Sequence, residues 1–419
     1  MNILKKTLEK NKEQYIQHLA DIIAIDTHDI GHGVLGGLEK VAQDYMIALF
    51  KKMGANVEVD PMREKVIQDF YRKHQEGNLG HNYENRYNVY ATFSGKSKRS
   101  LMFNGHMDVM PADNVEEWTH PPFQPVIQDG KMYGRGTADM KGGLMAAVMA
   151  VQLLKDAGYE LPIQIKITSV CDEEGGGNGS MQAISSGQRA DGCIVCEGTD
   201  EELIVAHMGF IFFRVEFEGK PCHSGTKKDG VSAIEKALRV IHALNEKEHE
   251  WLLNYKHPLL PAPNLNIGVI HGGNAGSTVP ADCYFETCVH YLPNIMSHDQ
   301  VVAEFQEVID RVTASDVWLE KHKPKVTIYQ SGHGFEMDTK DRLVTDFRKS
   351  YQEMLGREVN IVGSPSGCDS RLWRNIAKMP TIQFGPGALS EAHATDEFMS
   401  IEQYLNCILV YANLILKFA

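Results

Sequence analysis

The sequence predicts an α/β protein in which a larger mixed, mostly parallel sheet is flanked by helices and a smaller α+β domain is inserted. Apolar segments rich in β-branched residues alternate with helical patterns, which is typical of a buried parallel sheet. Polar residues directly follow several of these strands, where open α/β sheets bind their ligands. From about residue 208 to 318 the pattern changes to alternating strands and amphipathic helices, which indicates a second domain.

The first part of the chain reads as a helix followed by strands. "MNILKKTLEKNKEQYIQHLADIIAI" has apolar residues at helical spacing among charges, which favours an amphipathic helix over a signal peptide. "VEVDP" and "NRYNVYATFSG" resemble strands, and "REKVIQDFYRKHQEG" between them resembles a charged helix or a long connection. "SLMFNGHMDV" is a further apolar strand, and it ends in polar residues.

The next segments continue the α/β alternation. "GGLMAAVMAVQLLKDAG" predicts a helix that stops at Gly158. "PIQIKITSVCDEE" and "GCIVCEG" then predict two more strands, and the alternation resumes from about residue 325. We therefore assign residues 1–207 and 319–419 to the larger domain.

The inserted segment, 208–318, has its own order of elements. Strand-like "FIFFRVEFEG" precedes a helical pattern, "GVSAIEKALRVIHALNEKEHEWLLNY". Strand-like "LNIGVIHGG" and "DCYFETCVHYLP" follow, and then a second helix, "HDQVVAEFQEVIDRVTA". This β-α-β-β-α order predicts a compact sheet with helices on one face.

Composition narrows the class of protein. The 419 residues are 43% hydrophobic, which allows a sizeable core, and the formal net charge of −13 argues against a nucleic-acid surface. The chain has no run of about 20 apolar residues, so we expect no membrane partner. The eight cysteines are scattered, which suits a reducing compartment, and we expect a cytoplasmic protein.

Acidic and imidazole side chains gather at the predicted strand ends. They are His106, Asp108, Asp139, Glu173, Glu174, Glu197 and, far downstream, His393. Two imidazoles and five carboxylates suit zinc, cobalt or manganese, and suit neither calcium nor an iron–sulfur cluster. The i, i+2 spacing of His106 and Asp108 puts both on one side of an extended segment. From there a carboxylate can orient a metal-bound histidine.

Each of these elements also has a simpler interpretation. His106 and Asp108 could be a surface histidine and a turn aspartate, and Asp139 could be the N-cap of the following helix. "CDEEGGGNGS" could be a solvated turn, although two adjacent carboxylates repel unless a cation or proton intervenes. His393 could be a loop histidine. The repetition at successive strand ends favours one shared site.

The motifs "GHMDV", "YGRGTADMKGG", "CDEEGG", "CEGT" and "FGPGALSEAHATDE" occur in this order. Together they resemble the di-zinc hydrolase family that includes acetylornithine deacetylase, succinyl-diaminopimelate desuccinylase, aminoacylase and the glutamate carboxypeptidases. The resemblance covers nearly the whole chain. It implies a bound pair of zinc ions in each subunit, for which cobalt or manganese can substitute.

The resemblance also implies a role for each site residue. His106 and Glu197 bind one zinc, Glu174 and His393 bind the other, and Asp139, followed by a cis peptide bond, bridges both. Asp108 orients His106 from behind, and Glu173 is the general base.

In the inserted domain, His223 of "GKPCHSG" is similar to a family histidine that reaches the neighbouring active site of a homodimer. There it would stabilise the oxyanion, so we expect 208–318 to act as a dimerisation and lid domain. Arg371 of "SGCDSRLW" matches an arginine expected to contact a substrate carboxylate. Ser277 and His290 stand where the family often has asparagine and arginine in contact with substrate.

The function implied by the resemblance is removal of an N-acyl group, such as acetyl or succinyl, from an amino acid or small amine. Deacylases tend to carry glutamate at the position of Glu197, whereas peptidases tend to carry aspartate. A di- or exopeptidase on the same scaffold is one alternative. A degenerate metal-binding module without catalysis is another, which the presence of both Glu173 and Glu174 opposes.

Overall fold

The computed structural model describes residues 3–419, and its contacts divide the chain into two compact units. The first unit comprises Met1–Val205, Met337–Val362 and Cys368–Ala419. The second comprises Ala206–Glu336 and Gly363–Gly367.

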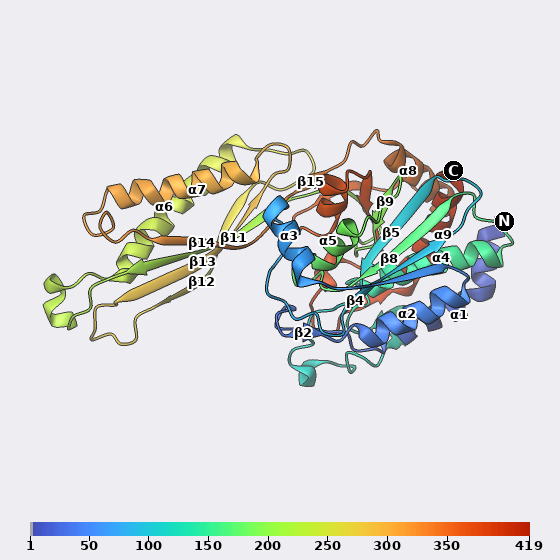
Figure 1. Cartoon of the computed structure of the whole chain (residues 1–419), viewed down its shortest axis with the longest axis horizontal. Coiled ribbons are helices and arrows are strands. Elements are labelled where there is room, and N and C mark those ends of the chain that lie inside the picture. Colours follow the sequence, from blue (N-terminus) through green and yellow to red (C-terminus); the bar gives the residue numbers. More distant parts are fainter. Residues whose placement is uncertain (1–2) are drawn as a thin grey trace. The chain divides into compact units, whose positions relative to one another are not determined.

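The first unit contains most of a mixed sheet with a parallel centre (Figure 1). Its strands are β3 (Asn56–Pro61), β4 (Tyr87–Phe93), β5 (Ser100–His106), β8 (Gln164–Val170), β9 (Cys193–Val195), β10 (Leu203–His207), β15 (Phe335–Glu336), β16 (Ile361–Ser364) and β17 (Thr381–Gln383). Their order is β15-β10-β17-β9-β5-β8-β4-β3, and β16 pairs with β10. The β8, β5, β9 and β17 neighbours are parallel, whereas β3, β4 and β10 pair antiparallel. The predicted mixed sheet, mostly parallel at its centre and flanked by helices, is confirmed.

Helices cover both faces of this sheet. They are α1 (Ile3–Ile23), α2 (Lys40–Lys52), α3 (Glu64–His74), α4 (Lys141–Asp156), α5 (Asn178–Ser185), α8 (Arg342–Leu355) and α9 (Ile401–Lys417). Adjacent residues of β5 show the two faces, because successive side chains of a strand point in opposite directions. The ring of Phe103 packs against Tyr411 of α9, with centroids 5.0 Å apart. The next residue, Asn104, donates a hydrogen bond to Ser180 of α5 at 3.3 Å.

Two helical segments show how sequence pattern and packing agree. Residues 63–77, read as a charged helix or a connection, form α3 and a following turn. The α4 segment is apolar on nearly all sides because it packs between the sheet and the helices α1 and α9. Gly158, just after α4, has a φ of +78°, as the predicted stop requires.

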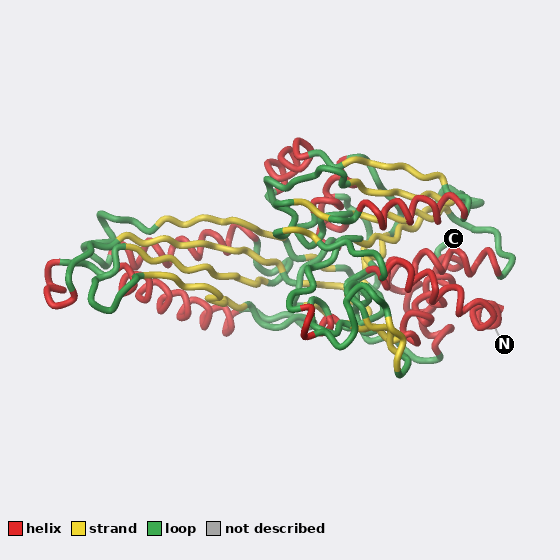
Figure 2. The backbone as a smooth tube through the Cα atoms, turned by 90° about the horizontal axis from the view of Figure 1, so that it is seen from below, coloured by secondary structure: helices red, strands yellow, loops and turns green. Residues whose placement is uncertain are grey.

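The second unit has an antiparallel sheet of order β12-β13-β11-β14. Its strands are β11 (Gly209–Glu218), β12 (Asn264–Gly272), β13 (Asp282–Tyr291) and β14 (Lys325–Gly332), and its helices are α6 (Ala233–Asn254), α7 (His298–Ala314) and the short η2 (Ser224–Asp229). Figures 1 and 2 show α6 and α7 lying along the strands. Buried and partly buried positions alternate along β11, and Phe213 on its covered face stacks on Phe305 of α7 at 3.9 Å.

The predicted β-α-β-β-α order matches β11, α6, β12, β13 and α7. The segment predicted as the insertion, 208–318, stops before β14, which pairs with β11. The compact unit accordingly continues to Glu336. The pairing of β14 with β11, which is distant in sequence, extends the second unit past residue 319. The local sequence pattern around residue 319 does not indicate this pairing.

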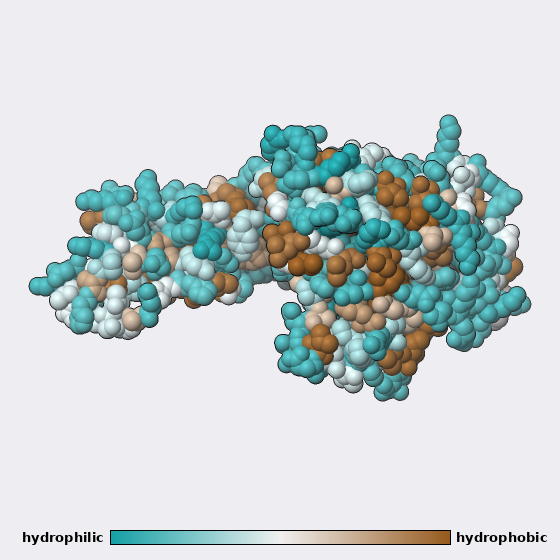
Figure 3. Space-filling model, turned by 60° about the horizontal axis from the view of Figure 1, so that its bottom comes forward, coloured by the Kyte–Doolittle hydropathy of each residue, from teal (hydrophilic) through white to brown (hydrophobic). Residues whose placement is uncertain are grey.

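The remaining elements are small. They are the hairpin β1 (Asp29–Ile30) and β2 (Gly36–Gly37), the three-stranded sheet of β6 (Val126–Gln128), β7 (Lys131–Tyr133) and β18 (Phe398–Ser400), and the short helices η1 (Val115–Glu117), η3 (Leu372–Ile376) and η4 (Leu389–Glu391). On the face seen in Figure 3, hydrophobic side chains form small groups between larger hydrophilic areas. Within residues 3–419, none of the helices combines the length and the apolar character needed to span a membrane.

Candidate metal centre

Three neighbouring strands of the first unit end at one edge of the sheet, and the candidate site lies there. His106 is the last residue of β5, Glu173 and Glu174 follow β8, and Glu197 follows β9. Strand β5 pairs in parallel with both β8 and β9. The carboxyl ends of parallel strands meet at the same edge, so the sheet brings these four predicted residues together.

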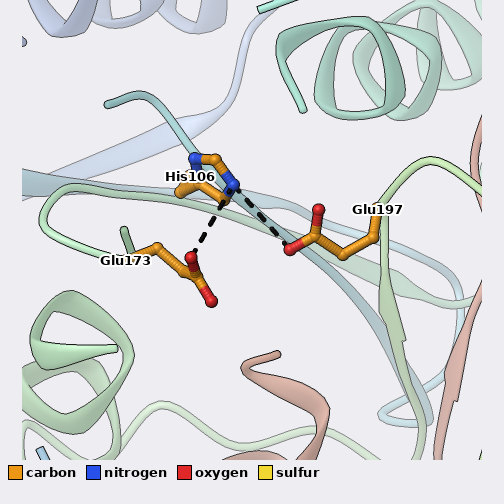
Figure 4. A group of neighbouring side chains, drawn as sticks. All are labelled: His106, Glu173 and Glu197. Carbon is orange, nitrogen blue, oxygen red and sulfur yellow. Dashed lines mark ion pairs between the residues drawn. The ribbon is translucent and has the colours of Figure 1, made fainter. Parts of the chain in front are cut away.

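His106 faces the carboxylates of Glu173 and Glu197 (Figure 4). Its Nε2 is 3.1 Å from Asp139 Oδ1, 3.8 Å from Glu197 Oε1 and 4.0 Å from Glu173 Oε2. Its Nδ1 lies 2.8 Å from the backbone oxygen of Asp108. A carbonyl oxygen only accepts hydrogen bonds, so Nδ1 is the donor. In the neutral ring this leaves the Nε2 lone pair directed at the carboxylates, as a metal ligand requires.

Asp139 stands between the two imidazoles. Its Oδ1 faces His106, and its Oδ2 is 3.2 Å from Nε2 of His393. That same His393 nitrogen is 3.1 Å from Glu174 Oε2. One oxygen for each imidazole is the arrangement expected of a bridging ligand. The Asp139–Met140 peptide is cis, as the resemblance implied, and Met140 takes the N-cap position of α4 that Asp139 could have filled.

The charges of this cluster test whether a metal fits. Asp139, Glu173, Glu174 and Glu197 bring four carboxylates to two imidazoles, so the cluster is short of positive charge. Burial raises the pKa of all three glutamates above the ordinary 4.5, because a carboxylate loses its hydration there. Glu174 Oε1 is buried and has no hydrogen-bond partner in the part of the chain that the structure describes. Oxygen and imidazole donors in this mixture fit divalent zinc, cobalt or manganese.

Asp108 supports the site through its backbone as well as its side chain. Its carbonyl accepts the hydrogen bond from His106, whereas its carboxylate oxygen Oδ1 stays 3.9 Å from that ring. Its Oδ2 accepts the backbone N–H of Glu174 at 3.0 Å. The i, i+2 spacing predicted the proximity of Asp108 and His106, but it gave no sign of the link from Asp108 to the β8 turn.

A buried ionic network, which the sequence did not predict, anchors the turn that carries Glu173. Asp172 Oδ1 pairs with Arg86 Nη1 at 2.9 Å, and Asp172 Oδ2 lies 2.8 Å from His81 Nδ1. Arg86 also pairs with Glu39 at 2.5 Å, and all four of these side chains are fully buried. The only indication in the sequence is Arg86, a single arginine before an apolar strand, and the sequence does not show which residues it pairs with.

Arg371, predicted to contact a substrate carboxylate, is engaged within the chain. Its Nε donates to Glu76 Oε2 at 2.9 Å, and its Nη1 donates to the backbone oxygen of Cys368 at 2.7 Å. Its Nη2 donates to the backbone oxygen of Gly176 at 3.3 Å. The side chains of Arg371 and Glu76 are 3% and 1% exposed. Glu76 did not stand out in the sequence, because it lies in a charged segment, "RKHQEG".

The other predicted substrate and catalytic residues lie in the second unit. His223 is exposed, and its Nδ1 accepts the backbone N–H of Gly225 at 3.1 Å. In a neutral ring this places the proton on Nε2, which can then donate to an oxyanion. Ser277 is also exposed, and its backbone oxygen accepts the N–H of Ser224. His290 lies on β13, partly buried, with Nδ1 3.2 Å from Asn264 Oδ1.

Comparison with known proteins gives concordant findings. The model of "Peptidase family M20/M25/M40" matches residues 102–417. An "N-formyl-4-amino-5-aminomethyl-2-methylpyrimidine deformylase" from Bacillus subtilis is 34% identical over 340 residues, covering 76% of this chain and 78% of that protein. A "probable succinyl-diaminopimelate desuccinylase" from Staphylococcus aureus is 30% identical, covering 80% of this chain and 87% of that protein.

One solved structure shows the shared fold. The M20 family metallo-carboxypeptidase Sso-CP2 from Sulfolobus solfataricus superposes with a TM-score of 0.76 at 17% sequence identity. The match covers 96% of this chain and 99% of that chain.

Proposed function

The chain belongs to peptidase family M20/M25/M40, and on this premise we propose that it is a metal-dependent deacylase that releases a small N-acyl group from a small amine. Its membership and its relatives make it a hydrolase of amide bonds. The observation that carries the proposal is Asp139, which offers one oxygen to His106 and the other to His393 beside Glu173. The identity of the acyl group, the identity of the amine and the number of bound metal ions are our proposals.

We assign the ligands in two sets that share Asp139. His106 and Glu197 complete one set, and Glu174 and His393 complete the other. Two zinc ions, or cobalt or manganese in their place, would when bound polarise the amide carbonyl and acidify a water molecule.

Glu173 is the residue we propose as general base. It follows β8 directly, and it lies farther from His106 Nε2 than Asp139 does, at 4.0 against 3.1 Å. Its neighbour Glu174 is held by the hydrogen bond from its N–H to Asp108. Glu173 would accept the proton of the attacking water and pass it to the leaving amine nitrogen. The buried contacts of Asp172 would keep Glu173 in position for both transfers.

The acyl group proposed first is formyl. The Bacillus subtilis relative is named as a deformylase of an aminomethylpyrimidine, and the Staphylococcus aureus relative as a probable desuccinylase. Glu197 supports a deacylase, since peptidases of the resembling family tend to carry aspartate there. Small acyl groups, formyl before acetyl and succinyl, are therefore the substrates to compare.

We also propose a cytoplasmic homodimer assembled through the second unit. His223 lies in that unit, and its exposed ring has Nε2 available as a donor. It would reach the active site of the partner subunit and stabilise the oxyanion there. The eight cysteines are all free, which supports a reducing compartment.

The test is a substrate screen with protein loaded with zinc or cobalt, following amine release. N-formyl, N-acetyl and N-succinyl amines are compared with dipeptides, and a Glu173→Gln protein prepared in parallel serves as the blank. We expect hydrolysis of N-acyl amines that a chelator abolishes and added metal restores. Cleavage of dipeptides alone would make the protein a peptidase, and no cleavage in any assay would favour the non-catalytic metal-binding module.

A further inference from the structure

We infer that Glu76 is a specificity-determining residue, which occupies the guanidinium of Arg371 and so selects amide substrates that have no carboxylate beside the scissile bond. This inference rests on the proposed function, because it concerns the amine part of the substrate of that same site. A free arginine would offer a planar fork to a carboxylate. In this chain the guanidinium of Arg371 already binds a carboxylate, that of Glu76.

The guanidinium lies directly against the turn that carries Glu173. Arg371 Nη2 donates to the backbone oxygen of Gly176, and a Cβ added at Gly177 would lie 3.2 Å from the same nitrogen. That added Cβ would also lie 2.8 Å from Asp369 Oδ1. A substrate group bound by Arg371 would therefore stand beside the proposed base. Whether Arg371 is already paired within the chain therefore affects which substrates the site accepts.

Each nitrogen of the guanidinium has an acceptor within the chain. Glu76 accepts the hydrogen bond from Nε, the carbonyl of Cys368 accepts that from Nη1, and the carbonyl of Gly176 accepts that from Nη2. Both members of the ion pair are almost fully buried. A substrate carboxylate would have to displace Glu76 from its buried position, which would leave a buried charge unpaired.

The backbone around Glu76 is built to bring this residue inward. Gln75, the C-cap of α3, has a φ of +55°, and Gly77 has a φ of +101°. A Cβ on Gly77 would lie 2.7 Å from Met181 Sδ and 3.0 Å from Asn178 Oδ1. Only glycine combines this conformation with such a close approach. The left-handed positions on either side of Glu76 thus reverse the chain after α3, bring Gly77 against α5 and leave Glu76 paired with Arg371.

The charges near the arginine also disfavour a further anion. Asp369 is buried two residues before Arg371 and accepts a hydrogen bond from Ser180. Arg371 therefore faces two carboxylates, Glu76 and Asp369, and carries no excess of positive charge. An incoming carboxylate would meet repulsion here, whereas an uncharged aminomethyl group would not.

A matched pair of substrates tests the inference on the unmodified, metal-loaded protein. N-formylbenzylamine and N-formylphenylglycine differ by one carboxylate on the carbon next to the amide nitrogen. We expect kcat/KM for N-formylbenzylamine to exceed that for N-formylphenylglycine by about tenfold or more, the discrimination that one unpaired buried charge produces.

Variants then assign this preference to Glu76. Glu76→Gln keeps the shape and an acceptor oxygen but removes the charge. We expect it to raise the kcat/KM ratio of N-formylphenylglycine to N-formylbenzylamine by about ten- to a hundredfold, as expected of a gained charge-assisted hydrogen bond. Glu84→Gln, an exposed glutamate of the same segment, should leave the ratio unchanged. Adding Arg371→Gln to Glu76→Gln should remove the gain, because the cation is then absent.

The outcomes separate this inference from the proposed function. If neither formyl compound is cleaved, the acyl group proposed first is wrong, and the same two amines are compared as their N-acetyl and N-succinyl derivatives; if none of these is cleaved, the proposed deacylase function fails. If both are cleaved at equal rates by the unmodified protein, the function stands and the inference about Glu76 is wrong. A folded, active Glu76→Gln protein with an unchanged ratio would also overturn it. The comparison of the two formyl substrates on the unmodified protein still tests the inference if the Glu76→Gln protein fails to fold.

Discussion

The two units build their sheets differently, and the difference decides where each unit buries its charged groups. In the first unit every residue of β5 is buried, and its polar end lies between the ends of β8 and β9. In the second unit β11 alternates buried and partly buried residues, and most of β12 is exposed or half-buried. The ionic groups buried near these strand ends therefore interact in a medium of low polarity, whereas most ionic groups of the second unit interact through water. The lesson is that equal charges should have unequal effects in the two units.

The largest expected difference concerns catalysis. Glu173→Gln in the first unit should lower kcat on N-formylbenzylamine by about 10²–10⁴-fold, the usual contribution of a general base. Its counterpart is Glu286→Gln on β13, which removes a glutamate paired with Arg214 at 2.9 Å. Glu286 is partly exposed and lies outside the candidate metal centre, so kcat should not change. Equal kinetic losses in the two variants would contradict the assignment of Glu173.

Buried and exposed ion pairs give the next contrast. Arg86→Met would leave Asp172 and Glu39 buried without their cation. Such a loss costs about 3–5 kcal/mol of unfolding free energy. Lys325→Met removes the pair with Glu216, made at 2.8 Å by a lysine side chain that is 73% exposed. That change should have no measurable effect on stability.

Urea unfolding of both variants, with the metal content held constant, measures this contrast. The Arg86→Met protein should also lose activity at temperatures where it is still folded, because Asp172 precedes Glu173 and the turn would lose its anchor. Equal stabilities of the two variants would show that the buried network contributes little.

His223 provides the third comparison, because here the second unit is expected to contribute to catalysis. His223→Ala should lower kcat by about 10²-fold, as for the loss of one oxyanion donor. His242→Ala, an exposed histidine of α6, is the matched control and should have no effect.

Mixing tests whether His223 acts on the partner subunit. His223→Ala and Glu173→Gln subunits are each nearly inactive, but a mixed dimer would contain one complete site. Random exchange should restore about a quarter of the unmodified activity, since half of the dimers are mixed and each has one working site. A fully active monomer in sedimentation, or no recovery on mixing, would contradict the proposed dimer.

The smallest effect concerns the dependence of stability on pH. In the second unit, burial alone would raise the pKa of Asp316, but hydrogen bonds from Lys236 and from the backbone N–H groups of Leu319 and Trp318 lower it below 3.8. The unfolded chain then binds the proton more readily than the folded one. The stabilisation by Asp316 is therefore fully present well above the pKa of an unfolded aspartate, about 3.9, and is lost as the pH falls through the lowered pKa of the folded state.

Asp316→Asn should remove this acid-dependent part and cost about 1.5 kcal/mol at neutral pH, the contribution of hydrogen bonds to a charged group. In the first unit, burial raises the pKa of Glu201, so the sign is opposite: stability gained at low pH is lost as the pH rises through the raised pKa. Hydrogen exchange of each unit between pH 3 and 7 would measure both. Acid profiles of equal slope in the two units would contradict the assignment.

Much of the fold and of the candidate site could be predicted from the sequence, for local reasons. His106 is the last residue of the apolar strand β5, and Glu173 and Glu197 follow the apolar strands β8 and β9. The parallel order of these strands brings their ends together. The helical pattern of α4 and its stop at Gly158 were equally local. The extent of the second unit could not be predicted, because β14 joins it by pairing with β11 more than 100 residues earlier.

The sequence by itself thus determined the α/β class, the set of carboxylates and imidazoles at the strand ends, and the family. The class and the polar strand ends follow from periodicity and spacing, which act over a few residues, whereas the family follows from the resemblance of five motifs in order. Only the tertiary structure decided that Asp139 offers one oxygen to each imidazole, that Arg86 anchors the turn before Glu173, and that Glu76 pairs with Arg371. The last pair joins residues 295 positions apart. A contact of that range depends on how the whole chain packs, and no local pattern records it.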